Sequence, residues 1–285
     1  MGSNLHRQWL GNDAERVFDL FLSFYKDFDG TLQEDKLYCE YRPGKKVAGY
    51  SAILEEYSSL ISNYKYVAFL DDDLQISSQE LNKLLNIANK NKFRISQPSL
   101  TLDSYYSYAA LLQDNAYEFR AVNFIEMMCP IFRSDMLPVV RQLFSLGLES
   151  GIDLIWCNTL NPSPGDFAVI DEIAVRHIAP VGARKAANGF VGSMRYEDHI
   201  FKVMKDYDIP WLPCVPFFGV TRGGKLIQNR AVMFWLSLRI FRAIWLRQGA
   251  LKRALAFGIY WKHMMFKQAK NLNVAVDPRK RESIV

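Results

Sequence analysis

Three consecutive aspartates, Asp71–Asp73, are the residues of this chain whose type and spacing point most directly to chemistry. They follow an apolar run, Tyr66–Leu70, whose valine and aromatic side chains favour a buried strand. The next helical pattern opens at Ser77, so the acids are expected just past the carboxyl end of a strand, where open α/β sheets bind ligands. Adjacent carboxylates repel one another unless a cation or several donors stabilise them. We therefore expect Asp71, Asp72 and Asp73 to bind Mg²⁺ or Mn²⁺ that arrives with a substrate diphosphate.

His177 is a candidate ligand for the same ion. It lies at the end of another expected strand, Ala168–Val175. A neutral imidazole is a good third ligand for ions such as Mn²⁺. The alternative is a histidine whose ring is satisfied by a backbone carbonyl. Both interpretations stay open, and the expected metal ligands are Asp71, Asp73 and His177.

Two further acids are candidates for proton transfer or substrate binding. Asp153 precedes an aromatic helical pattern, and a carboxyl group partly desolvated beside Trp156 would have a raised pKa and could deprotonate a hydroxyl group. Asp153 can equally be the N-cap of that helix. Glu126 stands in an apolar run, Ile125–Met128, where a carboxylate must face a site, pair with a cation or lie on a solvated face. We expect Asp153 and Glu126 to be catalytic and Glu126 and Trp156 to contact substrate.

The elements that must position these residues alternate between strands and helices from residue 18 to about residue 208. Apolar runs bounded by turn residues predict strands, and apolar residues at helical spacing predict helices. Ser77 and Glu80 have the spacing of a capping box. The alternation predicts an α/β fold with a mainly parallel sheet flanked by helices. The expected strands are Phe18–Tyr25, Tyr66–Leu70, Phe93–Gln97, Ile125–Phe132 and Ala168–Val175, and the expected helices are 47–63, a segment from Ser77, 134–147, 152–160 and 193–207.

The composition is that of a folded protein. The 285 residues are 49% hydrophobic and 14% aromatic, which excludes a disordered chain and allows one large α/β domain or two small ones. Four cysteines are scattered without a paired motif. Cys129 and Cys157 lie among apolar neighbours, so we expect reduced, packed thiols in a cytoplasmic protein. No secretory signal is visible at the N-terminus.

Residues 226–285 form a predicted basic, aromatic and helical extension. Residues 209–276 hold eleven Lys and Arg but no Asp or Glu. No stretch reaches the ~18 apolar residues of a membrane span. Two interpretations stay open: residues 231–270 bind an anionic membrane surface, or the helices pack on the domain with basic outer faces. We do not expect a nucleic-acid partner. On a helical wheel, one arc holds Lys252, His263, Lys267 and Lys270, and the opposite side holds Phe257, Trp261, Met264 and Met265.

Several segments, taken in order, resemble a known family. They are Leu5–Leu10, Phe69–Asp73, Ile95–Pro98 with Asp103–Tyr105, Ile125–Pro130, Ser150–Asp153, and Val169–Glu172 leading to Val175–His177 and Pro180–Gly182. Together they resemble the "domain of unknown function 707" family of plant and bacterial proteins, which look like glycosyltransferases of the GT-A fold. The resemblance covers roughly residues 5–225. It implies a GT-A-like domain over residues 1–225, a nucleoside-diphosphate-sugar donor, a divalent cation and transfer of a sugar to a hydroxyl acceptor.

The resemblance also implies roles for single residues. Asp71 and Asp73 match the D-x-D pattern of glycosyltransferases, with Asp73 a direct metal ligand and Asp71 contacting ribose or metal. His177 matches a late metal-binding histidine, and Asp153 matches the general base of inverting enzymes. A glycan, lipid-linked or surface-polysaccharide acceptor would suit a protein that is peripheral at the inner face of a membrane.

Two departures from the family are visible. GT-A folds open with a strand and a glycine-rich turn, and the sequence begins at that point, so whether the first strand is missing or replaced stays open. Tyr108 stands where a histidine is expected after the serines of the Ser104–Ser107 region.

Two other functions stay open. Haloacid-dehalogenase-like phosphatases also place two aspartates after an apolar strand, but they normally need Thr or Val where this chain has Gln75. A nucleotide-sugar-binding protein without turnover would keep the same metal and donor residues.

Overall fold

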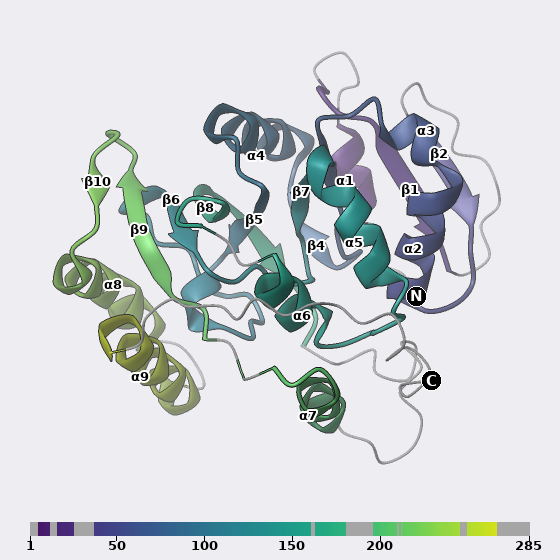
Figure 1. Ribbon diagram of the computed structural model, residues 1–285. Coiled ribbons are helices and arrows are strands. Elements are labelled where there is room, and N and C mark those ends of the chain that lie inside the picture. The colour runs from purple at the N-terminus through teal and green to yellow at the C-terminus, as the bar shows by residue number, and fades with distance from the viewer. Residues whose placement is uncertain are drawn as a thin grey trace.

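The computed structural model describes residues 5–11, 16–25, 37–160, 163–180, 196–209, 211, 213–245 and 250–266 (Figure 1). Its strands are β1 (Leu20–Phe24), β2 (Leu37–Tyr41), β3 (Tyr66–Ala68), β4 (Leu74–Gln75), β5 (Ile95–Leu100), β6 (Tyr117–Val122), β7 (Ile131–Arg133), β8 (Phe167–His177), β9 (Pro216–Thr221) and β10 (Leu226–Ile227). Its α-helices are α1 (His6–Leu10), α2 (Lys46–Glu56), α3 (Ser58–Ile61), α4 (Ser78–Asn91), α5 (Leu137–Phe144), α6 (Ile152–Thr159), α7 (Tyr196–Asp206), α8 (Arg230–Trp245) and α9 (Ala250–Phe266). Two 3₁₀ turns are η2 (Ala109–Leu111) and η3 (Ser134–Met136).

The α/β class is confirmed, but the prediction of a mainly parallel sheet is wrong. The large sheet has the strand order β10-β9-β6-β8-β5-β7-β3, and β4 pairs with β8 beside this path. β5 and β8 are parallel, whereas the other pairs in this sheet are antiparallel. A separate parallel pair is formed by β1 and β2.

The strands that the sequence did not reveal explain this difference. β6, β9 and β10 were not expected, and all three pair in antiparallel fashion. β9 lies before the expected helical extension, in residues for which no strand was predicted. Antiparallel neighbours need only short connections, whereas parallel neighbours need a crossover of a dozen or more residues. β9 and β10 are joined by a short turn, so no crossover helix between them could reveal the pair in the sequence.

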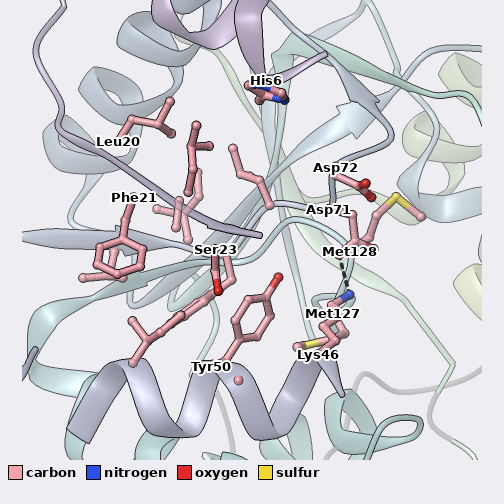
Figure 2. A pocket seen from close by; sticks show the side chains of 18 of the residues that line it. His6, Leu20, Phe21, Ser23, Lys46, Tyr50, Asp71, Asp72, Met127 and Met128 are labelled. Carbon is pink, nitrogen blue, oxygen red and sulfur yellow. Dashed lines mark ion pairs between the residues drawn. The ribbon is translucent and has the colours of Figure 1, made fainter. Parts of the chain in front are cut away.

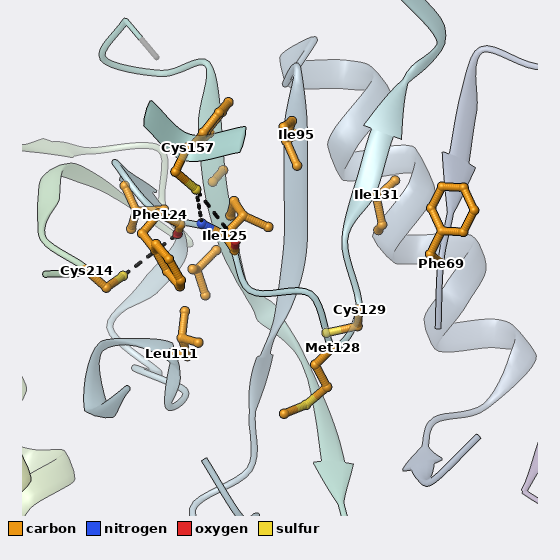
Figure 3. Close-up of a cluster of buried hydrophobic side chains, with 14 of the residues drawn as sticks. Phe69, Ile95, Leu111, Phe124, Ile125, Met128, Cys129, Ile131, Cys157 and Cys214 are labelled. Carbon is orange, nitrogen blue, oxygen red and sulfur yellow. Dashed lines mark hydrogen bonds between the residues drawn. The ribbon is translucent and has the colours of Figure 1, made fainter. Parts of the chain in front are cut away.

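The predicted strand Ile125–Phe132 exists only at its end, as β7. Figure 3 shows why its first half is a loop: side chains hold the backbone there. The Ile125 N–H donates to Cys157 Sγ at 3.4 Å, and Cys214 Sγ donates to the Phe124 carbonyl at 3.8 Å. Backbone groups satisfied by side chains do not need a neighbouring strand.

Of two local predictions, the start of α4 is confirmed and the end of β5 is not. The capping box at the start of α4 is confirmed, because the Glu80 N–H donates to Ser77 Oγ at 3.2 Å and the Ser77 N–H donates to Glu80 Oε2 at 2.9 Å. β5, expected to end before Pro98, continues to Leu100. Its pairing with β8 shifts register between Pro98 and Ser99, and such an irregularity tolerates a proline inside a strand.

The core lies between the large sheet and the helices that cover it. Phe132 packs edge-on against both Phe69 and Trp156, at ring centroid distances of 5.9 Å and 5.4 Å. Cys129 and Cys157 are buried and free, which confirms the prediction of packed thiols. These contacts connect β3 and β7 to α6, so the segments that carry the candidate residues share one core.

The C-terminal helices α8 and α9 pack against each other. Trp261 Nε1 donates to Ser237 Oγ at 2.8 Å, and Phe257 and Met264 are fully buried, as the helical wheel predicted. Met265, predicted on the same side, is 36% exposed. Of the expected basic arc, the Lys252 side chain, Lys267 and Lys270 lie outside the described residues.

Figure 1 shows α8 and α9 beside β9 and β10, at the opposite end of the molecule from β1 and β2. The predicted domain boundary between residues 225 and 226 falls just before β10. Because β10 pairs with β9, the strands on either side of that boundary belong to one sheet.

Candidate functional site

A cleft of about 710 Å³ lies between β1, the acidic loop after β3, and the start of α2 (Figure 2). Its lining includes six of the seven candidate residues, which come from four separate segments of the chain. These six are Asp71, Asp72, Asp73, Glu126, Asp153 and His177. The fold thus brings the expected metal ligands and the expected catalytic acids to one cavity.

The acidic loop is held by backbone hydrogen bonds on both sides. The Asp71 N–H donates to the Met128 carbonyl at 3.1 Å, and the Ile178 N–H donates to the Asp73 carbonyl at 3.2 Å. The short strand β4 then pairs antiparallel with the end of β8, with Leu74 opposite His177. This pairing places the histidine beside the acids, although the two segments are far apart in the sequence.

Asp73 and His177 form the centre of the acidic corner. Asp73 Oδ2 and His177 Nε2 are 3.4 Å apart, and both residues are buried. His177 Nδ1 lies 3.0 Å from the Tyr105 carbonyl, so this ring is held by a backbone carbonyl and also faces a carboxylate. Burial alone would lower the pKa of His177, but the hydrogen bonds to Asp73 and to the Tyr105 carbonyl, together with the charges of Asp73 and Glu126, outweigh burial and the pKa is raised.

Asp71 has a different partner. Its carboxylate forms an ion pair with the Lys46 ammonium group, drawn as a dashed line in Figure 2. Burial raises the pKa of Asp71, and the charge of Lys46 opposes that rise. Asp72 accepts a hydrogen bond from the Tyr25 hydroxyl at 3.4 Å. Each of the three aspartates therefore has a different neighbour.

The residues present fit a divalent ion that arrives with a diphosphate. Asp73 Oδ2 and His177 Nε2 lie 3.4 Å apart, so both side chains could contact one ion. In the described part of the chain, no group of three such side chains is arranged around one point. Mg²⁺ in phosphate-transfer sites is commonly bound through one or two carboxylates and completes its shell with phosphate oxygens and water. Asp73 would supply one carboxylate and His177 an imidazole, while Asp71 is engaged by Lys46.

Glu126 is a buried carboxyl group that lines the same cleft. Its N–H donates to Gln97 Oε1 at 2.8 Å, which fixes the backbone. Burial raises the pKa of Glu126 to about 7; a hydrogen bond from Ser107 opposes the rise and the charge of Asp153 adds to it. Oε2 is buried without a hydrogen-bond partner among the described residues. An unsatisfied carboxyl oxygen in a cleft is costly unless a ligand reaches it.

Asp153 lies in the first turn of α6, near Glu126. The N-cap of α6 is Gly151, which has a φ of 75° and contributes no side-chain cap, so the interpretation of Asp153 as the N-cap is wrong. Asp153 instead accepts the Leu154 N–H at 3.0 Å. Burial raises its pKa to about 6, and backbone hydrogen bonds moderate the rise.

The prediction that Trp156 contacts substrate is wrong, because its side chain is fully buried and does not line the cleft. Trp156 Nε1 donates to the Ile125 carbonyl at 3.1 Å, next to Glu126. The indole therefore positions the loop that carries this acid. Trp156 follows Asp153 by three positions, a spacing that puts two side chains on the same face of a helix, so only the packing decided that the indole is buried and does not line the cleft.

Sequence reasoning missed Lys46 and Glu149. Glu149 Oε1 accepts the Val47 N–H at 3.0 Å, so it caps the helix whose first residue is Lys46. The signal available for Lys46 was its place directly before an apolar helical pattern. Tyr108 stands where a histidine was expected. Burial raises the pKa of Tyr108, and Asp153 and Glu126 lie close enough for their charges to raise it further.

Comparisons with known proteins assign no family. No family model matches the chain, and no curated protein matches it. Among solved structures, it is similar to the crystal structure of A197 from STIV, with 13% sequence identity and a TM-score of 0.33, over 68% of this chain and 80% of that chain. Similarity of this size carries no inference about function.

Proposed function

We propose that this protein is a metal-dependent glycosyltransferase that moves a sugar from a nucleoside-diphosphate sugar to a hydroxyl acceptor. One observation carries the proposal: a single cleft holds an acidic corner with an adjacent histidine and two further carboxyl groups, the buried Glu126 and the half-buried Asp153, whose pKa values desolvation raises to about 7 and about 6. The first group suits a cation with a diphosphate, and the second suits proton transfer from a hydroxyl group near neutral pH. The GT-A-like fold implied by the family resemblance is part of the proposal.

The donor end of the cleft is the corner formed by Asp73 and His177. These two side chains would hold Mn²⁺ or Mg²⁺, with Asp71 and Asp72 beside them. The bound ion would neutralise the charge that develops on the leaving diphosphate. The Lys46 ammonium group, which lines the same cleft, adds a positive charge close to this point.

The acceptor end of the cleft is formed by Asp153 and Glu126. In the transfer step, the acceptor oxygen bonds to the anomeric carbon, and the bond from that carbon to the diphosphate breaks with its electron pair. The acceptor proton passes to Asp153, which is the more acidic of the two and therefore mostly ionised at pH 7. Glu126, which lines the cleft beside Asp153, orients a sugar or acceptor hydroxyl. Transfer with one base and no covalent intermediate inverts the anomeric centre.

The decisive experiment measures binding of UDP and of GDP by calorimetry, with and without Mn²⁺. Binding should need Mn²⁺, and Asp73→Ala should weaken it at least tenfold, because the ion loses a ligand. Asp135→Asn, an exposed aspartate paired with Arg133 outside the cleft, is the matched control and should bind as the parent does. Unchanged affinity in Asp73→Ala would refute the metal assignment.

Turnover separates the proposal from its two alternatives. A transferase should consume donor in the presence of an acceptor, and Asp153→Asn should lose that activity while still binding the diphosphate. Release of phosphate from simple phosphomonoesters would favour the phosphatase. Donor binding without hydrolysis or transfer, equal in the parent and in Asp153→Asn, would favour a binding protein.

We further propose that the protein works at the cytoplasmic face of a membrane, on a glycan or lipid-linked acceptor, and binds anionic lipid through residues 231–270. In the described residues no helix combines the length and apolar character needed to cross a bilayer. Support comes from the outer faces of α8 and α9, where large apolar side chains are exposed next to basic ones. They are Val232, Trp235, Leu251, Leu255, Ile259, Met265 and Phe266, with Arg239, Arg242 and Lys262.

A further inference from the structure

Lys46 is a positively charged residue that the fold places against the acidic corner. Its ammonium group pairs with the Asp71 carboxylate, and both side chains are 25% exposed and line the cleft. Figure 2 shows Lys46 at the start of α2, with its ammonium group directed toward Asp71. The first residue of a helix lies at the positive end of the helix dipole, which disfavours a positive side chain there. The carboxylate of Asp71 offsets part of this cost.

The backbone next to Lys46 is anchored, so a change of partner would involve its side chain alone. Val47 is fully buried, and its N–H donates to Glu149 Oε1 at 3.0 Å. One turn further along α2, the Tyr50 ring packs on Phe69, with the ring centroids 4.6 Å apart, just before the acidic loop. A lysine ammonium group is a point charge on a flexible four-carbon stem. It can therefore exchange one oxygen partner for another without movement of the helix.

The ion pair with Lys46 keeps Asp71 from acting as a metal ligand. Asp73 Oδ2 and His177 Nε2 are 3.4 Å apart, but among the residues that the structure describes no three potential ligands surround one point. Asp71 belongs to the same short loop as Asp73 and lines the same cleft. Carboxylate oxygens are the preferred ligands of hard divalent ions, which carry twice the charge of an ammonium group. An ion held by Asp73 would therefore compete with Lys46 for the carboxylate of Asp71.

A diphosphate would supply the anion that a displaced lysine needs. A partly buried ammonium group is costly when no anion is near it, and lysine is a common phosphate-binding residue. A complex of a divalent ion with a diphosphate presents positive charge on one side and negative charge on the other. Asp71 and Lys46 offer the complementary charges and, without a ligand, offer them to each other.

We propose that Lys46 is a diphosphate-binding residue of the cleft and that it binds by exchange of partners. Without a ligand it pairs with Asp71; when a divalent ion and a diphosphate bind together, Asp71 turns to the ion and Lys46 to a phosphate oxygen. Because both ligands must enter this cleft for the exchange to occur, it rests on the proposed function. The exchange makes the two ligands depend on each other, since either one alone breaks the ion pair and satisfies only one of its members.

The first test titrates the full chain with Mn²⁺ alone and follows the electron paramagnetic resonance signal of the unbound ion. Lys46→Met should bind Mn²⁺ at least about fivefold more tightly than the parent, because the Asp71 carboxylate becomes available to the ion. In a chain that already carries Asp71→Asn, the same substitution should gain less than about twofold, because that carboxylate is absent. A lysine that acts only through its charge would give the same gain in both backgrounds.

The second test measures binding of inorganic pyrophosphate by calorimetry in the presence of Mn²⁺. Lys46→Met should weaken this binding at least about fivefold, because the phosphate loses its cationic partner. The substitution thus has opposite effects on the two ligands. Lys45→Met is the matched control, because it removes the same charge from an exposed side chain of the same cleft, one residue earlier. It should bind both ligands within about twofold of the parent, since solvent screens an exposed charge.

Failure of the exchange and failure of the proposed function give different results. If Asp73→Ala abolishes pyrophosphate binding but Lys46→Met binds as the parent does, the exchange is wrong and the cation site stands. Equal gains in Mn²⁺ affinity in both backgrounds, or equal effects of Lys46→Met and Lys45→Met, would assign the changes to net charge and overturn the exchange. Absence of pyrophosphate binding by the parent would also overturn it, whereas failure of UDP and GDP to bind would overturn the proposed function as well.

Discussion

Glu126 is the residue whose environment makes the sharpest pH-dependent prediction. Burial raises its pKa to about 7 in the folded protein, compared with 4.5 for the unperturbed group. Between these two values the folded state keeps a proton that the unfolded state releases, so the free energy of unfolding falls as pH rises through this window. The full loss above pH 7 corresponds to ~3 kcal/mol.

Glu126→Gln should remove this pH-dependent loss, because glutamine does not ionise. Urea unfolding should show equal stability for the variant and the parent at pH 4, and greater stability for the variant at pH 8. Glu118→Gln, which changes a carboxyl group outside the cleft, is the control. A parallel pH profile for the parent and Glu126→Gln would mean that Glu126 titrates normally.

At the residue scale, the sequence identified six cleft residues correctly as neighbours but could not identify their partners. The acidic triplet was visible because three charges follow an apolar run. Lys46 could not be recognised as a site residue in the sequence, because a lysine before a helix is common on solvated surfaces. Its ion pair with Asp71 exists only once α2 packs beside the loop after β3.

At the scale of elements, the buried ion pair between Arg120 on β6 and Asp171 on β8 holds the centre of the sheet. Arg120 Nε donates to Asp171 Oδ2 at 2.7 Å and Arg120 Nη2 donates to Asp171 Oδ1 at 2.8 Å. Arg120 also donates to the Ala110 and Leu112 carbonyls at 2.8 Å each. The pair thereby ties η2 to two neighbouring strands.

Arg120→Met should cost about 3–5 kcal/mol in the free energy of unfolding, because it leaves the Asp171 carboxylate buried without its partner. The double variant Arg120→Met with Asp171→Leu should be less destabilised than this single variant, because no charge remains unpaired. Chemical denaturation of both proteins measures the difference. Additive losses in the double variant would contradict the coupling.

The elements also show which local signals suffice. The capping box at Ser77 determined the start of α4 because both partners lie within one turn of helix. Whether neighbouring strands pair in parallel or antiparallel fashion could not be predicted from such local signals. β6 and β9 pair over a long separation in sequence, and their turn and loop residues resemble those of any connection between elements.

At the scale of the whole molecule, the paired helices α8 and α9 lie at the opposite end from β1, whose residues line the cleft (Figure 1). Leu255 and Ile259 are 63% and 55% exposed, one turn apart on α9. Apolar side chains contribute ~1.5–3 kcal/mol each when fully removed from water, and nearby basic residues favour anionic headgroups.

Replacing both Leu255 and Ile259 by glutamate should reduce flotation with phosphatidylglycerol vesicles at least tenfold, without loss of stability, because both side chains are exposed. Phe201→Glu on α7, 60% exposed, is the matched control and should float as the parent does. Binding of the parent should weaken as salt rises. Equal flotation of all three proteins, or equal binding to phosphatidylcholine vesicles, would contradict a role for this surface in binding anionic lipid.

The sequence by itself determined the α/β class, the start of α4, the packed cysteines and the acidic triplet Asp71–Asp73, because each depends on residues within a few positions of one another. Only the tertiary structure decided that the sheet is mixed, that Trp156 supports a loop instead of contacting a ligand, that Lys46 pairs with Asp71, and how His177 faces Asp73. These outcomes depend on the pairing of β4 with β8 and the packing of α2, which join distant segments. Contacts between distant segments leave no recognisable spacing of residues in the sequence, because their geometry forms only when the core packs.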